Sequence, residues 1–318
     1  MAKTGEHPEH SSSSGGADAH HHDPLDAGHL IGHVKDAPHF EVPKAISGGT
    51  GKWHVPQFRE SKEPIATVGI GFKPIDDMIE PLDARVTKFM VLEVVVAVII
   101  AVLFITFARK IAAEDRPRGR LTNMLEAFLV YLRDEVARPC IGDHDGMRFV
   151  PLVWTVFFFV LGCNLMGLVP WLGSPTGSLA TTGALALVIF LTVVGSGMVK
   201  MGPVKFWLAQ VPSMDLPLPL AIILKPLIFV IEIAGLLIKH FVLAVRLFAN
   251  MTAGHLVLAV VFAFIAASWQ SMAVWGVVPA SILGATVFNM LELFVAFLQA
   301  FIFAFLTALF IGMAVHPH

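Results

Sequence analysis

The two longest apolar runs of the chain constrain its fold more than any other feature. They extend over residues 216–266 and 273–315, and few charged residues interrupt them. A helix perpendicular to a bilayer needs only about 20 apolar residues, and these runs of roughly 50 and roughly 43 residues are about twice as long. Each run is therefore either two spans with almost no loop between them or one long, steeply tilted helix. Both alternatives place the chain in a membrane.

The composition agrees with this and argues against several other classes of protein. Hydrophobic residues make up 56% of the chain and charged residues 14%, which is more apolar material than one soluble core would hold. The formal net charge of −2 provides no basic surface for nucleic acid. The sequence contains no phosphate-binding loop, nucleophile triad or clustered set of metal ligands. We therefore expect no nucleic-acid partner, no cofactor, no metal and no catalysis by the chain itself.

Three further spans and one surface helix are predicted upstream of the long runs. Residues 89–108 form an apolar run of one span, and 149–199 contain two charge-free runs around the turn "GSPTG", which indicates a transmembrane hairpin. Between these spans, residues 118–138 place apolar side chains at spacings of three and four, which predicts an amphipathic helix on the membrane surface. With each long run counted as one helix, residues 86–318 form an all-α polytopic membrane domain with about five crossings.

The N-terminal residues 1–85 are polar and rich in Gly, Ser and His, and they lack the layout of a signal peptide. We predict a flexible tail, with metal binding by its irregularly spaced histidines as the alternative. Lys and Arg occur in segments 109–148 and 200–215 but not in 171–178 or 267–276. The positive-inside rule then places the N-terminus outside and the C-terminus in the cytoplasm.

Four charged residues recur at intervals of seven along the first long run: Lys225, Glu232, Lys239 and Arg246. Seven residues fall about 20° short of two helical turns, so the four lie on one slowly drifting stripe, which Asn250 continues. A charge at the bilayer centre costs about 2.5–3.5 kcal/mol, so these side chains must face protein or water. Pairing along the helix or snorkelling to an interface is the alternative. It fits Arg246 least, because no carboxylate lies three or four positions away.

A second polar set lies on the last long run, where Asn289, Glu292 and Gln299 share one helical face. Glu292 requires a polar partner at membrane depth, and we expect that partner to be His255 on the preceding helix. A histidine that meets a carboxyl group in the membrane provides what a proton relay requires. The alternative is that His255 is a core histidine with one satisfied hydrogen bond.

Three stretches together resemble the a subunit of F-type ATP synthases. They are "VRLFANMTAGHLVL", "LELFVAFLQAFIFAFLTALFIGMAV" and "PLVWTVFFFVLGCNLMGLVPWL", and the resemblance extends from about residue 110 to the end of the chain. It implies a stator subunit in the inner membrane of a bacterium, with two offset half-channels beside a rotating ring of c subunits. The implied further partners are b-type peripheral stalk subunits, a soluble ATPase sector and the lipid bilayer.

The resemblance also implies roles for individual residues. Arg246 matches the arginine that faces the ring carboxylate, and Glu232 matches the acidic residue of the cytoplasmic half-channel. The polar positions of the opposite half-channel are matched by Asn250, His255, Glu292 and Gln299. Lys239 and Asn289 are secondary candidates for proton translocation. Relative to some bacterial members, the acid and the histidine exchange helices, which keeps the pair together. The turn sequence "SPTGSLATTG" contains only Ser and Thr as polar residues, so we assign no channel residue to it.

Two other functions remain as alternatives at this point. A stand-alone ion-coupled secondary transporter would use the intramembrane charges for a substrate site and should show an inverted repeat or discontinuous helices. We find no convincing similarity between the two halves of the sequence. A structural membrane scaffold would use the stripe only to pair with a partner helix, and it would tolerate neutral replacement of both partners.

Overall fold

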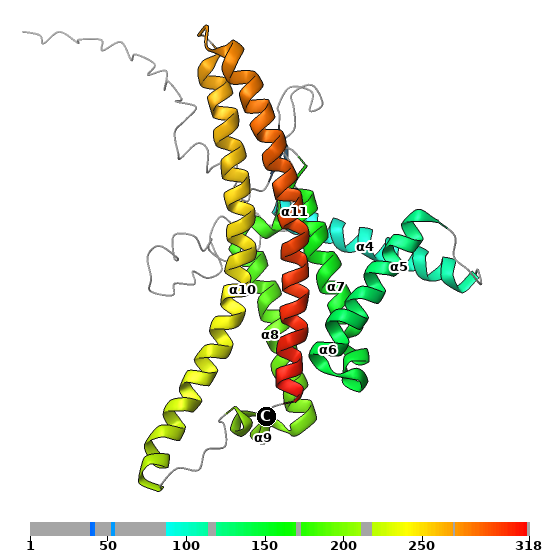
Figure 1. Cartoon of the computed structure of the whole chain (residues 1–318), viewed down its shortest axis with the longest axis vertical. Helices are drawn as coiled ribbons and strands as arrows, with labels where there is room; N and C mark the ends of the chain where they lie inside the picture. The colour runs from blue at the N-terminus through cyan, green and yellow to red at the C-terminus, as the bar shows by residue number, and fades with distance from the viewer. Residues whose placement is uncertain are drawn as a thin grey trace, which may run out of the picture.

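The structure is a computed structural model that describes residues 39–41, 52–54, 87–113, 119–169, 173–210, 218–269 and 271–316. Helices dominate this part of the chain (Figure 1). The helices and helical turns are α4 (Lys88–Ala113), α5 (Arg120–Tyr131), the π-helical η1 (Leu132–Ala137), α6 (Arg138–Ile141), α7 (Asp143–Gly167), the 3-10 turn η2 (Pro175–Gly177), α8 (Leu179–Met201), α9 (Pro203–Ala209), α10 (Leu218–Ser268) and α11 (Val274–Val315).

Five of the described helices are long and apolar enough to cross a membrane: α4, α7, α8, α10 from Ile223 onward, and α11. This confirms the predicted all-α polytopic class. Helix α10 is continuous over 51 residues and α11 over 42, so each long run forms one helix rather than two short spans. Pro226 and Pro279 lie inside these helices, and each is close to the N-terminal end, so most of the helix follows without interruption.

Two short strands lie within the N-terminal extension. β1 (His39–Glu41) pairs with β2 (Lys52–His54) in an antiparallel arrangement, and Phe40 lies opposite Trp53. The prediction of a tail did not include this pairing. The remaining histidines of the extension, with the metal-binding alternative, lie outside the described residues.

The surface helix predicted over 118–138 forms α5 and then continues as the π-helical turn η1 and the short α6. On η1, Asp134 accepts a hydrogen bond of 2.8 Å from Arg133 and forms an ion pair of 2.9 Å with Arg138. The hydrogen bond from Arg133 lowers the pKa of the Asp134 carboxyl. These charges therefore pair with one another on the outer side of the segment, while Leu132 and Val136 join the hydrophobic core.

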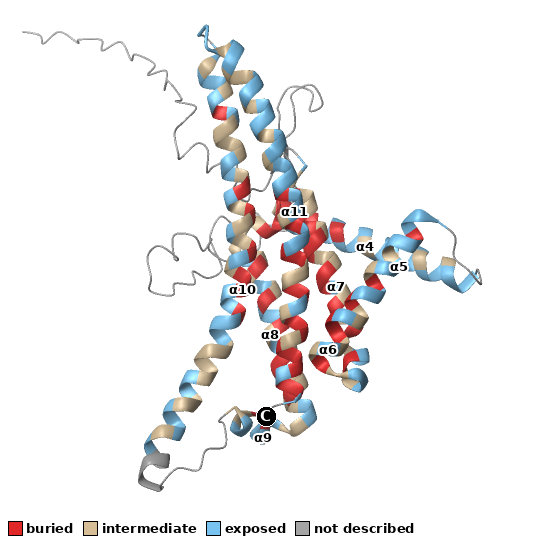
Figure 2. Ribbon diagram, viewed as in Figure 1, coloured by how far each residue is buried: buried red, intermediate tan, exposed pale blue. Residues whose placement is uncertain are grey.

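The core lies where the C-terminal half of α11 packs against α7 and α8, and the upper parts of α10 and α11 extend beyond it (Figures 1 and 2). All of the buried residues of α11 lie from Glu292 onward. A row of small residues recurs at intervals of four along this buried half, and each is fully buried. The row consists of Ala296, Ala300, Ala304 and Ala308. Such a row lets neighbouring backbones approach closely, which is how helices associate in lipid.

Gly312 continues the row and touches the backbone of α6. A Cβ added at Gly312 would lie 2.9 Å from the carbonyl carbon of Cys140. We therefore expect Gly312→Ala to separate α11 from α6 and to lower the free energy of unfolding by about 1–3 kcal/mol. The check is the temperature at which the purified protein unfolds in detergent. Gly284→Ala is the matched control, because nothing lies within 4 Å of a Cβ at Gly284. Equal unfolding temperatures for the two variants would contradict the predicted contact.

Candidate functional site

The charged stripe of α10 lies on the outside of the bundle. Lys225, Lys239 and Arg246 are exposed, and Glu232 is partly buried. Arg246 forms no hydrogen bond or ion pair with any other residue that the structure describes. The opposite face of the helix, which includes Ala244 and Met251, is buried in the bundle. The guanidinium of Arg246 is therefore directed away from this chain and toward whatever lies beside α10.

Two small residues share the exposed face with Arg246. Ala249 and Ala253 follow it at intervals of three and seven, and both are exposed. A neighbouring helix could therefore approach the backbone of α10 closely at the level of the arginine. Asn250, the next polar residue of the stripe, is partly buried beside this surface.

A second polar group lies between α10 and α11. Glu292 and Gln299 are each 4% exposed, and His255 is partly buried. Several of the described side-chain atoms here are buried and have no hydrogen-bond partner: Thr252 Oγ1, His255 Nε2, both carboxyl oxygens of Glu292 and Gln299 Nε2. Unpaired polar atoms at membrane depth are costly, so their concentration in these two helices marks a candidate functional site.

Glu292 reaches α10 at a glycine. A Cβ added at Gly254 would lie 3.0 Å from the carboxyl carbon of Glu292, so the carboxyl group packs directly against the α10 backbone. His255 Nε2 and both carboxyl oxygens of Glu292 have no hydrogen-bond partner among the described residues, so no hydrogen bond joins the two residues that the sequence predicts to meet. The Glu292 carboxyl group packs on Gly254. Successive residues of an α-helix point about 100° apart, so the side chain of His255 points to one side of this contact and is a neighbour rather than a bonded partner.

Asn289 differs from the other members of its predicted face. It is exposed, whereas Glu292 and Gln299 are buried. Asn289 is exposed because it precedes Glu292, at which burial of α11 begins. The three residues share a face of the helix, as expected, but only two of them reach the interior of this chain.

A network of buried hydroxyl groups joins the hairpin turn to α11. Ser174 Oγ lies 2.6 Å from Thr176 Oγ1, which donates a hydrogen bond of 2.7 Å to Asn164 Oδ1. Asn164 Nδ2 in turn donates a bond of 3.4 Å to the carbonyl oxygen of Ala296, between Glu292 and Gln299 in α11. Sequence reasoning assigned no role to this turn. The available signal was Asn164 itself, a fully buried amide in an otherwise apolar helix.

Two more sets of polar contacts were not predicted. Thr181 on α8 donates a hydrogen bond of 2.8 Å to Glu93 on α4, which ties these helices together. His240 is 4% exposed and lies between the rings of Phe190 and Phe310, at centroid distances of 5.2 and 4.9 Å. Its Nε2 has no hydrogen-bond partner among the described residues.

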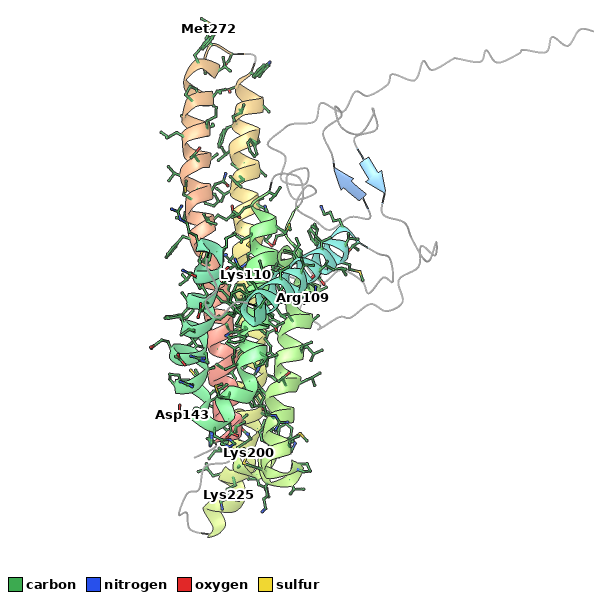
Figure 3. The ribbon with its side chains drawn as sticks, turned by 90° about the vertical axis from the view of Figure 1, so that its right-hand side faces the viewer. Arg109, Lys110, Asp143, Lys200, Lys225 and Met272 are labelled. Carbon is green, nitrogen blue, oxygen red and sulfur yellow. The ribbon has the colours of Figure 1, made fainter. Side chains whose placement is uncertain are left out.

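The other end of the stripe borders a large cavity. Glu232 and Lys239 line a cavity of about 890 Å³, together with residues of α6, α8, α9 and the end of α11. Figure 3 shows Lys200 and Lys225 toward this end of the bundle and Met272 at the opposite end, in the turn between α10 and α11.

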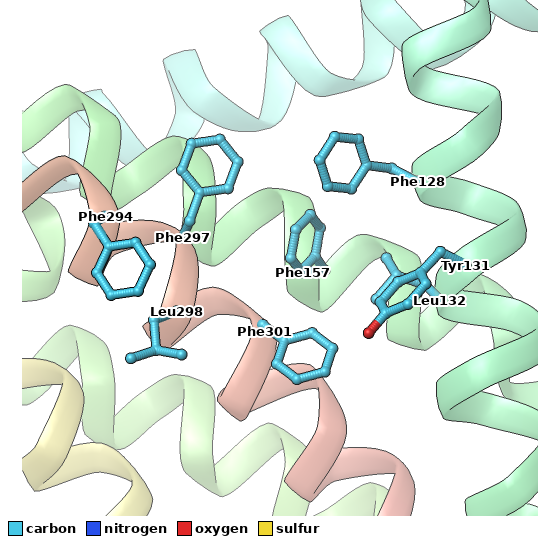
Figure 4. A pocket seen from close by; sticks show the side chains of 8 residues that line it. All are labelled: Phe128, Tyr131, Leu132, Phe157, Phe294, Phe297, Leu298 and Phe301. Atoms are coloured by element: carbon cyan, nitrogen blue, oxygen red, sulfur yellow. The ribbon is translucent and has the colours of Figure 1, made fainter.

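A second pocket, of about 220 Å³, is lined only by aromatic residues and leucines between α5, η1, α7 and α11 (Figure 4). Its lining offers no path for a charge.

The fold and this site define a class, namely a multi-pass membrane protein with two long helices that carry ionisable groups at membrane depth. The family model described as "ATP synthase A chain" matches residues 90–312. A protein of Myxococcus xanthus named "ATP synthase subunit a" is 35% identical over 291 residues, which are 89% of this chain and 92% of that protein. A protein of the same name from Anaeromyxobacter dehalogenans strain 2CP-C is 34% identical over 319 residues, covering 100% of this chain and 76% of its own length.

A third relative, from Magnetococcus marinus, has the same name and is 39% identical over 226 residues, or 70% of this chain and 82% of that protein. The chain belongs to the family of F-type ATP synthase a subunits. It is therefore a membrane-sector subunit of a complex that contains other ATP synthase subunits, and it takes part in ATP synthesis and proton transport.

Proposed function

We propose that this chain provides two half-channels for protons and the arginine that couples proton flow to rotation of a c-ring. The observation that carries the proposal is the position of Arg246, which is exposed on α10 without a partner in the described chain and lies between two polar regions. An arginine keeps its proton at all relevant pH values, so its charge cannot serve as a relay. It can hold a carboxyl group of a neighbouring chain in the ionised form.

The outer half-channel contains Asn250, His255, Glu292 and Gln299, with Asn289 as a secondary residue toward its entrance. A proton that enters here neutralises a carboxylate on one c subunit, and the neutral subunit can then move into lipid. The buried polar atoms between α10 and α11 support this route, because a proton or water that reaches them relieves their desolvation.

The inner half-channel contains Glu232 and Lys239 and opens through the cavity of about 890 Å³. After nearly a full turn of the ring, a carboxyl group approaches Arg246, becomes ionised and releases its proton along this route. A unit charge that crosses a potential of 100 mV releases about 2.3 kcal/mol, so several protons must be coupled to each ATP that is made.

The proposed orientation of the chain in the membrane follows from the positions of its lysine residues. Lys200 and Lys225 lie toward the end of the bundle that holds the cavity, which the positive-inside rule places in the cytoplasm. The C-terminus then lies in the cytoplasm, and residues 1–85 form an extension outside the membrane domain 86–318. The partners are the c-ring, b-type peripheral stalk subunits and the soluble ATPase sector, in the inner membrane of a bacterium. The chain itself catalyses no reaction.

The proposal is tested on inverted membrane vesicles that carry the assembled complex. We expect ATP addition to acidify the vesicle interior, and we expect purification through this chain to recover a small two-helix proteolipid and a soluble ATPase. Vesicles from cells that lack only this chain are the control and should show no ATP-driven acidification. Recovery of the chain alone, with ion flux that needs no ATPase, would instead favour a stand-alone secondary transporter.

A further inference from the structure

Three charged side chains from distant parts of the sequence meet at the end of the bundle that holds the cavity. Asp145 lies in the first turn of α7, Lys200 in the last turn of α8, and His316 directly after α11. His316 Nε2 lies 3.3 Å from Asp145 Oδ2, and Lys200 Nζ forms an ion pair with the same carboxyl oxygen. The carboxylate therefore joins the ends of three helices that pack in the core.

His316 also belongs to the lining of the cavity of about 890 Å³ that contains Glu232 and Lys239. Its side chain is 55% exposed, so the imidazole borders both the cavity and the surrounding medium. About 10–15 Å³ is enough for one water molecule, so a cavity of this size can hold a continuous chain of water from His316 to Glu232. The ring thus lies where such a chain would meet the medium.

We propose that His316 is a proton-transfer residue at the mouth of the inner half-channel and that Asp145 and Lys200 position it. This inference depends on the proposed function of the chain. During ATP synthesis, a ring nitrogen of His316 takes a proton from water in the cavity and then gives it to water or buffer in the cytoplasm. During pumping the same steps run in reverse, so one proton enters and one leaves in each cycle.

The chemistry of the cluster fits this role. An imidazole gains and loses a proton near neutral pH, which few other side chains do. Asp145 brings a charge opposite to that of the imidazolium form, and Lys200 brings a like charge, so their effects on the ring oppose each other. Among the described residues, the other ionisable groups nearby are His144 on α7 and Cys140, Glu232 and Lys239 in the lining of the cavity. The cluster can therefore hold the ring in place at the edge of the cavity.

The alternative is that the cluster only ties the helix ends together. Exposed ion pairs contribute little to stability, and the close packing of Gly312 on α6 already anchors this end of α11. A structural role predicts a defect that is the same at every buffer concentration. A proton-transfer role predicts a defect that a mobile buffer can remove, because the buffer delivers protons directly to the cavity.

The test measures ATP-driven acidification of inverted vesicles, in which protons enter the complex from the cytoplasmic face on the outside. His316→Gln keeps a side chain that can donate a hydrogen bond to Asp145 but cannot carry a proton. In weakly buffered alkaline medium we expect this variant to pump about 3-fold to 10-fold more slowly than the wild type. Added imidazole, a higher buffer concentration or a lower external pH should restore the rate.

The matched control is His144→Gln. His144 is an exposed histidine next to Asp145, and it does not line the cavity, so this variant should pump at the wild-type rate in all media. Asp145→Asn removes the ion pair but keeps His316, and we expect a smaller loss with the same dependence on buffer. Pumping rates are divided by the amount of assembled complex. Each variant is also compared with itself across buffer concentrations, so poor assembly does not affect the result.

Two outcomes overturn the inference. One is a wild-type rate for His316→Gln in weakly buffered alkaline medium. The other is a loss that stays constant across buffer concentrations, which would make the cluster structural. Failure of the proposed function has a different signature, because Arg246→Ala would then pump like the wild type in the same vesicles. The comparison between His316→Gln and His144→Gln does not depend on that result.

Discussion

We expect Arg246→Ala to abolish ATP-driven proton pumping, with a fall in rate of about 100-fold or more, while the complex stays assembled. The physical reason is that, in the proposed mechanism, the guanidinium is the fixed charge beside the path of the ring carboxyl. In the proposed mechanism, no other positive charge lies at this level of α10 to hold that carboxyl in the ionised form as it passes between the two polar regions. The side chain is exposed and makes no hydrogen bond or ion pair with other described residues, so its removal leaves the packing of this chain intact.

The measurement compares acidification of inverted vesicles at matched amounts of assembled complex. Lys225→Ala is the control, because it removes an exposed positive charge from the same stripe, near the N-terminal end of α10. We expect it to pump normally. Arg246→Lys should remain strongly impaired, since an ammonium group has a different reach and can lose its proton. Full pumping by Arg246→Ala would show that the stripe is structural, and the site assignments would then have to be withdrawn.

Much of the architecture could be predicted from the sequence, because a bilayer permits few solutions. A chain in lipid must satisfy its backbone within helices, so the length of each apolar run determines the number of spans. The spacing of seven residues predicts that Lys225, Glu232, Lys239 and Arg246 share one side of α10. Three of them are exposed, and Glu232 is partly buried. The choice between one long helix and two short ones was open, and the structure shows one helix for each run.

The details of the site could not be predicted, because they depend on contacts between distant segments. The bond from Asn164 to the carbonyl of Ala296 joins residues 132 positions apart, and no local pattern indicates it. Periodicity placed Asn289 and Glu292 on one face but could not show that burial of α11 begins at Glu292. Periodicity also could not show that the Glu292 carboxyl group packs against Gly254 without a hydrogen bond to His255.

The second large effect is expected for Glu292→Gln, which should slow proton pumping by about 10-fold to 100-fold at matched assembly. Glutamine has nearly the same size and shape, so it can occupy the space beside Gly254 without disturbing the packing of α10 on α11. It cannot, however, take up and release a proton. The predicted loss therefore separates a proton-carrying role of the carboxyl group from a purely structural one, in which an amide would serve equally well.

A variant of the facing glycine tests the same site without changing the carboxyl group. Gly254→Ala places a methyl group where the Glu292 carboxyl now lies, so the carboxyl must move, and we expect pumping to fall although the residue can still carry a proton. Gly284→Ala, which meets nothing within 4 Å, should pump normally. A wild-type rate for Glu292→Gln would remove this residue from the proton path. Impaired pumping by both Glu292→Gln and Gly254→Ala, with Gly284→Ala unaffected, would mean that the outer half-channel needs both the acid and its place against the α10 backbone.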